Sequence, residues 1–227
     1  MASELHVCHL GHVEYREAAA LQERLREQVI AGELPELMLL LEHPPVYTVT
    51  RRTEASDLPF PDSFYRERGI DVVRTPRGGQ LTYHGPGQLV GYPIMRVASV
   101  PEYILTMEQG LVAALADAGV EAGTRLGHKH VGVWVGDRKI ASVGVHISHG
   151  VSSHGFAVNV DNDLDPFSWV VACGLPEVQM TSVAAEGVSE SIACFRKRAA
   201  WRFCEAFGRR QRIVSAARLG IEQPVAA

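Results

Sequence analysis

The sequence lacks three features that would each point to a particular class of protein: a long apolar run, an excess of positive charge and paired cysteines. No apolar run approaches the roughly 18 residues of a membrane-spanning helix. The formal net charge is −4, so the surface as a whole does not attract nucleic acid or an anionic membrane. The first residues, MASELHVCHLGH, have neither the basic flank nor the apolar block of a signal peptide. We therefore expect a cytoplasmic protein with no nucleic-acid or membrane partner.

The four cysteines, Cys8, Cys173, Cys194 and Cys204, include no pair with C-x-x-C spacing. This excludes a zinc knuckle and a thioredoxin-like pair, and in a reducing compartment we expect four free thiols. Cys8 alternates within an apolar stretch, and Cys194 and Cys204 fall within a predicted helix, where a thiol packs like a small apolar side chain. Cys173 lies between Ala172 and a glycine, just after an apolar segment. A glycine after a nucleophile leaves its backbone N–H free to face a developing oxyanion, and the alternative is a small buried thiol.

Two groups are rich in potential metal ligands: His6, Cys8, His9 and His12, and His146, His149 and His154. Residues that alternate along a strand point to opposite faces, so the first group cannot converge. The second group has no cysteine or carboxylate at a fixed spacing to complete a zinc site. The run DNDLD at residues 161–165 resembles the start of a calcium loop, but Pro166 replaces the turn glycine and Ala172 the bidentate glutamate. We expect no metal and no other cofactor.

Length and composition favour a single domain spanning residues 1–227. With 46% hydrophobic and 21% charged residues, a chain of 227 residues can bury a sizeable core. No internal repeat, low-complexity segment or charge block divides it, and we expect residues 220–227 to form a frayed tail.

Hydrophobic periodicity predicts both helices and strands. The expected helices cover residues 15–31, 64–68, 100–118, 165–171 and 189–207, and the expected strands residues 4–10, 36–42, 70–73, 131–135, 139–148 and 154–160. The helix over 100–118 is expected to bury Ile104, Leu105, Leu111, Val112 and Leu115, the last helix Ile192, Phe195, Trp201 and Phe207, and Trp134 is expected in the core. The pattern predicts an α+β fold with a mixed, mostly antiparallel sheet flanked by helices.

The stretch RGGQLTYHGPGQLVGYPI, residues 77–94, holds five glycines, at 78, 79, 85, 87 and 91. Glycines at this density let a ligand approach the backbone closely and leave N–H groups free to bind its oxygens. On this interpretation Thr82, Tyr83 and His84 line the wall of a site. The alternative is a glycine-rich turn between two strands, residues 81–83 and 89–94.

The same stretch resembles the signature of the lipoyl(octanoyl) transferases, which move an octanoyl group from acyl carrier protein to a lysine of a lipoyl domain. A second block, HPPVYTVTRR at residues 43–52, resembles the family segment in which His43 shapes one edge of the acyl site. Here the chain departs from the family, because Thr50 stands where glycine is usual and would be strained at positive φ. The resemblance implies the catalytic fold of biotin protein ligases and lipoate–protein ligases.

The resemblance also implies the site residues. ACGLP at 172–176 is similar to the family's nucleophile segment and DRKIASVG at 137–144 to its lysine block, which makes Cys173 and Lys139 the expected catalytic pair. A neighbouring ammonium lowers a thiol pKa from about 8.5 by roughly one to three units. The expected substrate-binding residues are His43, Arg77, Gly78, Gly79, Gln80, Leu81, Thr82, Tyr83, His84, Ser142, Val143, Gly144, Gly155, Phe156 and Ala157.

A two-step acyl transfer follows from this resemblance, with Cys173 first acylated by octanoyl-acyl carrier protein and then attacked by a lysine amine. The implied acceptors are the lipoyl domains of 2-oxoacid dehydrogenase E2 subunits and the glycine cleavage H protein, and we expect a monomer. Two alternatives stay open. An ATP-dependent lipoate ligase would share the fold but need no cysteine, and a non-enzymatic relative would bind acylated carrier protein without the catalytic pair.

Overall fold

A computed structural model describes residues 3–125, 127, 130–171 and 178–221. Within them lie an eight-stranded sheet, in the order β11-β1-β2-β6-β10-β9-β8-β7, and a three-stranded sheet, in the order β4-β3-β5. The strands are β1 (Glu4–His12), β2 (Leu37–Glu42), β3 (Val46–Val49), β4 (Asp71–Arg74), β5 (Thr82–His84), β6 (Gln88–Ile94), β7 (Gly123–Thr124), β8 (Gly132–Val135), β9 (Arg138–Ser148), β10 (Val151–Asn159) and β11 (Arg210–Ile213). The helices are α1 (Tyr15–Ala31), α2 (Asp62–Glu67), α3 (Val100–Asp117), α4 (Asp165–Ser168) and α5 (Ile192–Ala206), with 3-10 turns η1 (Ala55–Asp57) and η3 (Ala216–Leu219).

The large sheet is mixed. Strands β11, β1 and β2 run parallel. From β2 onward every neighbouring pair, through β6, β10, β9, β8 and β7, is antiparallel. The expected mixed, mostly antiparallel α+β architecture is therefore confirmed, although the strands divide into two sheets.

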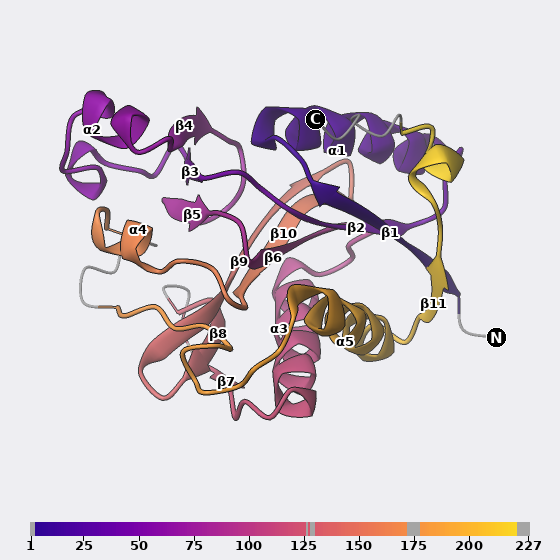
Figure 1. The fold of residues 1–227 in the computed structure, drawn as a ribbon. Coiled ribbons are helices and arrows are strands. Elements are labelled where there is room, and N and C mark those ends of the chain that lie inside the picture. The colour runs from indigo at the N-terminus through magenta and orange to yellow at the C-terminus, as the bar shows by residue number, and fades with distance from the viewer. Residues whose placement is uncertain (1–2, 126, 128–129, 172–177, 222–227) are drawn as a thin grey trace.

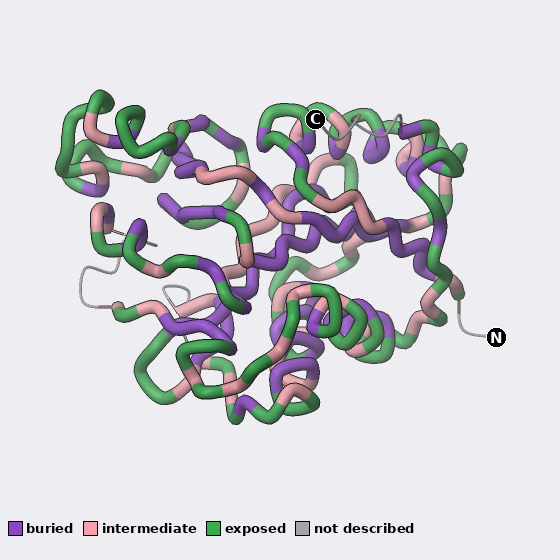
Figure 2. The backbone as a smooth tube through the Cα atoms, in the orientation of Figure 1, coloured by how far each residue is buried: buried purple, intermediate pink, exposed green. Residues whose placement is uncertain are grey.

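Helices cover both faces of the large sheet, with α1 on one side and α3 and α5 on the other (Figure 1). Strand β2 shows why: Met38 and Leu40 pack toward α3 and α5, whereas Leu37, Leu39 and Leu41 pack toward α1. A strand apolar on both faces can only lie inside such a layer. Figure 2 accordingly shows the central strands as buried.

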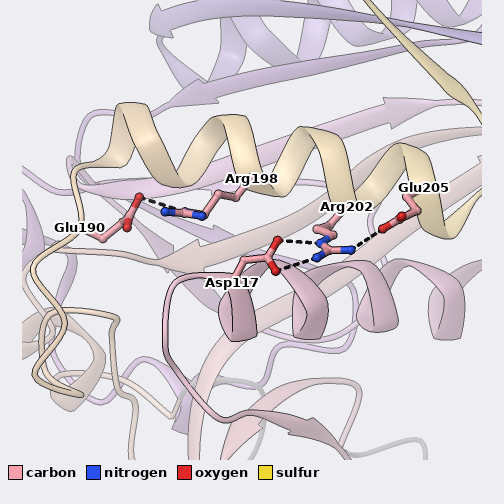
Figure 3. A network of polar contacts seen from close by, with 5 residues as sticks. All are labelled: Asp117, Glu190, Arg198, Arg202 and Glu205. Atoms are coloured by element: carbon pink, nitrogen blue, oxygen red, sulfur yellow. Dashed lines mark hydrogen bonds and ion pairs between the residues drawn. The ribbon is translucent and has the colours of Figure 1, made fainter.

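Helices α3 and α5 pack closely. A side chain at Gly110 in α3 would place its Cβ 3.2 Å from the backbone of Arg202 and Phe203, so glycine permits the contact. At the edge of this contact the guanidinium of Arg202 donates to both carboxylate oxygens of Asp117, at 2.6 and 2.7 Å, and to Glu205 (Figure 3). This ion pair links the C-terminal end of α3 to α5 at the rim of their apolar contact.

The small sheet has its own aromatic core. Tyr47, Tyr65, Tyr83 and Phe167 are buried there, and the hydroxyl of Tyr47 donates to the carbonyl of Pro166 at 2.5 Å. This cluster joins β3 and β5 to α2 and α4, and so sets the position of the glycine-rich stretch that runs between β4 and β6.

Most predicted elements are present, and α1 has the predicted bounds. Two predicted core positions are wrong, because Leu105 is 47% exposed and Trp201 59% exposed. Ile104, Val112, Ile192 and Phe207 are only partly buried. The buried stripe of α3 instead runs through Tyr103, Met107, Leu111 and Leu115. Trp134 is buried as predicted.

Strand β10 begins at Val151 rather than at residue 154, and β11 was not predicted. None of the helices in the described part of the chain has both the length and the apolar character required to cross a membrane.

Candidate active site

A cavity of about 320 Å³ lies where the glycine-rich stretch meets β9 and β10. The contact between them is direct, since the N–H of Gly78 donates to the carbonyl of Val145 at 2.9 Å. The described residues that line it are Tyr15, Arg52, Arg77, Gly79, Gln80, Leu81, Thr82, His84, Tyr92, Val131, Lys139, Ser142, Val143, Gly144, His154, Gly155, Phe156 and Ala157.

The cavity has an open end and a closed end. Arg52 and Gly79 are exposed, and Gln80 and Val131 are half-buried, which places the mouth beside them. Tyr15, His84, Tyr92 and His154 are all buried and form the closed end.

Glycines, which have no side chain, allow the elements around the cavity to approach one another closely. A Cβ at Gly144 would lie 2.8 Å from the carbonyl oxygen of Gly78, so a glycine at position 144 lets the two backbones approach this closely. A Cβ at Gly91 would overlap the ring of Phe156, which fills that space from β10. The second half of the stretch does form the turn of the alternative interpretation, between β5 and β6, while its first half lines the cavity.

Strand β5 divides its residues between two faces. Thr82 and His84 line the cavity. Tyr83, between them, points to the opposite face and packs in the aromatic core with Tyr47 and Phe167, where burial raises the pKa of its hydroxyl to about 12. The expectation that all three line the wall was therefore wrong for Tyr83, because neighbouring strand residues alternate.

His43 supports the closed end from behind without lining it. The side chain is fully buried; Nδ1 lies 2.6 Å from the carbonyl of Val13 and Nε2 2.7 Å from the hydroxyl of Tyr92. A carbonyl can only accept, so Nδ1 carries the proton and Nε2 accepts from the tyrosine. Burial lowers the His43 pKa to about 4, consistent with a neutral ring.

Two polar side chains anchor the loop at the mouth. The guanidinium of Arg77 donates to the hydroxyl and the carbonyl of Thr48, at 2.7 and 3.0 Å. The hydroxyl of Thr50 donates to the carbonyl of Gly79 at 2.9 Å and accepts from the N–H of Arg52 at 3.1 Å. Thr50 does not have a positive φ, so the strain considered for it does not arise.

Lys139 reaches the cavity from the start of β9 and is 2% exposed. Its backbone pairs with the segment around Met180, donating to Gln179 at 2.8 Å and accepting from Thr181 at 2.9 Å. Its ammonium lies 5.5 Å from the centre of the Trp134 ring. Cys173, the expected nucleophile, lies outside the described residues.

A buried carboxylate stands near Lys139. Glu108 of α3 is 6% exposed and accepts the N–H of Gly132 at 2.5 Å. A Cβ at Gly132 would lie 2.6 Å from Cε of Lys139, so the lysine passes directly over this glycine. Burial raises the Glu108 pKa, while the Gly132 hydrogen bond and the Lys139 charge act in the opposite direction.

Sequence reasoning missed several lining residues: Tyr15, Arg52, Tyr92, Val131 and His154. Tyr92 lies in the glycine-rich stretch and His154 was considered only as a zinc ligand, whereas Tyr15 has no sequence signal beyond starting a helix. In the described part of the chain, no group of three or more His, Cys, Asp or Glu side chains could hold a metal ion.

Comparison with known protein families shows which family this chain belongs to. Residues 14–203 match the model of the lipoyl protein ligase A/B catalytic domain. The chain belongs to this family.

Members of the lipoyl protein ligase A/B family include octanoyltransferases similar to this chain. The one from Solibacter usitatus is 46% identical over 187 residues, which are 81% of this chain and 84% of the relative. The one from Acidobacterium capsulatum is 39% identical over 90% of each chain. These relatives confirm the predicted resemblance and the expectation of an acyltransferase.

Solved structures confirm the family's fold. Lipoate-protein ligase A bound with ATP superposes with a TM-score of 0.75 at 18% identity, over 95% of this chain and 89% of that one. Biotin protein ligase from Aquifex aeolicus gives 0.50 at 11% identity, over 89% and 68%. The expected resemblance to the catalytic fold of both ligases is thereby confirmed.

Proposed function

We propose that this protein transfers an octanoyl group from octanoyl-acyl carrier protein to a specific lysine of lipoyl domains, through a thioester on Cys173. The arrangement of the cavity is the main support for this proposal. Three blocks far apart in sequence, residues 77–84, 142–144 and 155–157, contribute to one cavity with Lys139. We infer that residues 1–227 act as one catalytic domain, monomeric and cytoplasmic, with no cofactor.

The cavity suits a short acyl chain. Leu81, Val143, Phe156 and Ala157 supply apolar lining. Its volume of about 320 Å³ is at the small end of the range of ligand pockets, roughly 300–1,000 Å³. An unbranched chain of eight carbons needs such a narrow apolar space, whereas the nucleotide of a ligase would need additional room.

The chemistry begins with a thiolate. The ammonium of Lys139 lowers the pKa of the Cys173 thiol, so that the thiolate is the abundant species at neutral pH. Its sulfur attacks the thioester carbonyl, and the phosphopantetheine thiol leaves with a proton relayed through Lys139. The neutral amine of the acceptor lysine then attacks the carbonyl of the acyl-enzyme. An amide bond forms as the bond between that carbonyl and the Cys173 sulfur breaks, Cys173 is released as a thiolate, and the proton lost by the amine passes to Lys139. The first step exchanges one thioester for another and is nearly balanced; the amide makes the second step favourable.

Lipoyl domains of 2-oxoacid dehydrogenase E2 subunits and the glycine cleavage H protein are the acceptors in this proposal. One similar solved structure is described as an archaeal lipoate protein ligase and its E2 lipoyl domain, with a TM-score of 0.71 at 18% identity. We propose no nucleic-acid or membrane partner.

Octanoyl transfer without nucleotide tests the proposal. Purified protein, octanoyl-acyl carrier protein and a lipoyl domain are mixed with EDTA and without ATP, and the mass of the lipoyl domain is followed. We expect one octanoyl group to be added. Transfer only from free octanoate with ATP and magnesium would assign the protein to the ligases instead.

A further inference from the structure

His154 has an unusual backbone at the closed end of the cavity. Its φ is +56°, and in the described part of the chain only His149, at +50°, is another non-glycine residue with positive φ. His149 lies exposed in the turn between β9 and β10, where such a conformation is common. His154 instead lies within β10, and its N–H donates to Oε1 of Gln22 at 2.6 Å.

This conformation places the imidazole in the end wall. The His154 ring lies edge-on to Tyr92, with centroids 5.9 Å apart, and is 6% exposed. Its Nε2 lies 3.4 Å from the hydroxyl of Thr75, which also accepts from the hydroxyl of Tyr15 at 3.0 Å. His154 therefore contacts β6 through the Tyr92 ring and is linked to α1 through Thr75 and Tyr15.

The strand register gives the distance along β9 and β10 between two lining residues, Ser142 and His154. Ser142 pairs with Ala157 and Val145 with His154, so the His154 level is three residues beyond the Ser142 level. At about 3.4 Å per residue in an antiparallel strand, this distance is roughly 10 Å. An extended chain spans about 3.3–3.6 Å per three bonds, so the seven carbon–carbon bonds of an octanoyl group span roughly 8 Å. An octanoyl group with its carbonyl near Ser142 ends just before His154.

We propose that His154 is the chain-length stop of the acyl pocket: its side chain closes the cavity behind the eighth carbon and excludes decanoyl and longer chains. This inference rests on the proposed function for the nature of the ligand. It concerns a different property, the upper limit of acyl chain length, which can be measured by the binding of free fatty acids without any transfer reaction.

His154→Gly opens the end wall and fits the backbone, because glycine adopts positive φ without cost. The matched control is His149→Gly, which relieves the same backbone constraint away from the cavity. His154→Asn is an intermediate variant, since asparagine is smaller and also tolerates this conformation.

Binding of free octanoate, decanoate and dodecanoate to each protein is measured by calorimetry, and transfer from the matching acyl carrier proteins by mass. We expect wild type and His149→Gly to prefer eight carbons. For His154→Gly we expect two ratios to rise at least about tenfold: dodecanoate to octanoate affinity, and dodecanoyl to octanoyl transfer rate. His154→Asn should bind decanoate and transfer decanoyl groups, but not dodecanoyl groups.

Unchanged ratios in both His154 variants, or loss of octanoate binding with the fold retained, would overturn the chain-length stop. If His154→Gly binds longer fatty acids but wild type transfers no acyl group, His154 still limits chain length and the proposed transfer is wrong.

Discussion

Three buried histidines, His43, His84 and His154, surround the closed end of the cavity. Burial lowers the pKa of His43 to about 4 and that of His154 to about 3, and lowers that of His84 well below its usual value. His43 and His84 also lie within 5.6 Å of each other, ring centre to ring centre, so a charge on one disfavours a charge on the other. These rings are neutral in the folded protein at physiological pH.

A pH dependence of stability follows from these neutral rings. Below pH about 6.5 an unfolded histidine binds a proton that the folded protein does not, so the free energy of unfolding falls as pH decreases. Each histidine contributes a loss of up to ~1.4 kcal/mol per pH unit between its unfolded and folded pKa values. We expect the urea midpoint to be flat from pH 8 to 7 and to fall from pH 6.5 to 5.5.

The variant His43→Gln should reduce this slope, because it removes one of the titrating groups, while His149→Gln at the exposed turn should leave it unchanged. A midpoint that does not move between pH 7 and 5.5, or equal slopes in all three proteins, would contradict neutral burial.

At the scale of elements, the β8–β9 hairpin determines where Lys139 lies. Gly132 opens β8 with φ +133°, and its N–H is held by Glu108 of α3. A Cβ there would meet both Cε of Lys139 and, at 2.4 Å, the carbonyl oxygen of Ala141. Glu108 of α3, Gly132 and Lys139 therefore pack against one another beside the cavity.

Replacing Gly132 by alanine should displace the lysine. We expect Gly132→Ala to slow acyl-enzyme formation at least about tenfold, since the ammonium no longer reaches its place. Gly136→Ala is the matched control, because Gly136 also has positive φ but has no atom within 4 Å of its Cβ position. Rates are compared at a temperature where both variants remain folded by circular dichroism.

In a Lys139→Ala background, Gly132→Ala should have little further effect, since residues that act together show non-additive changes. Fully additive losses would mean that Gly132 acts on the strand rather than through the lysine.

Elements with a clear period could be predicted from the sequence, and others could not. Helix α1 is bounded by Gly32 in a left-handed conformation, a stop that is visible in the sequence. Leu105 and Trp201 were wrongly assigned to the core because periodicity does not show how wide a face of a helix its neighbours cover. Strand β11 is short, mostly exposed and reads RQRI, so it carries no apolar alternation.

The site was predictable only where it is made of consecutive residues. The glycine-rich stretch and the blocks around Ser142 and Phe156 were identified and line the cavity. Tyr15 and His154 come from other elements and close it through packing that no spacing in the sequence reveals. The roles of Cys173 and Lys139 stay predictions.

At the scale of the whole molecule, the two sheets meet so that one cavity collects α1, the glycine-rich stretch, β6, β9 and β10. Arg52, Gly79, Gln80 and Val131 mark its open end, and Lys139 lines it as a buried side chain. We propose that an acyl group enters this cavity while attached to the sulfur of Cys173.

The direct test is the intact mass of the protein after mixing with octanoyl-acyl carrier protein. The background is Cys194→Ser, because Cys194 is exposed, whereas Cys8 and Cys204 are buried with pKa values raised to about 11. We expect one octanoyl adduct, none after the further change Cys173→Ser, and formation slowed roughly ten- to a hundredfold by Lys139→Ala at neutral pH, less at pH 9. An adduct that persists in Cys173→Ser, or no adduct in a background protein that still octanoylates lipoyl domains, would contradict the acyl-enzyme.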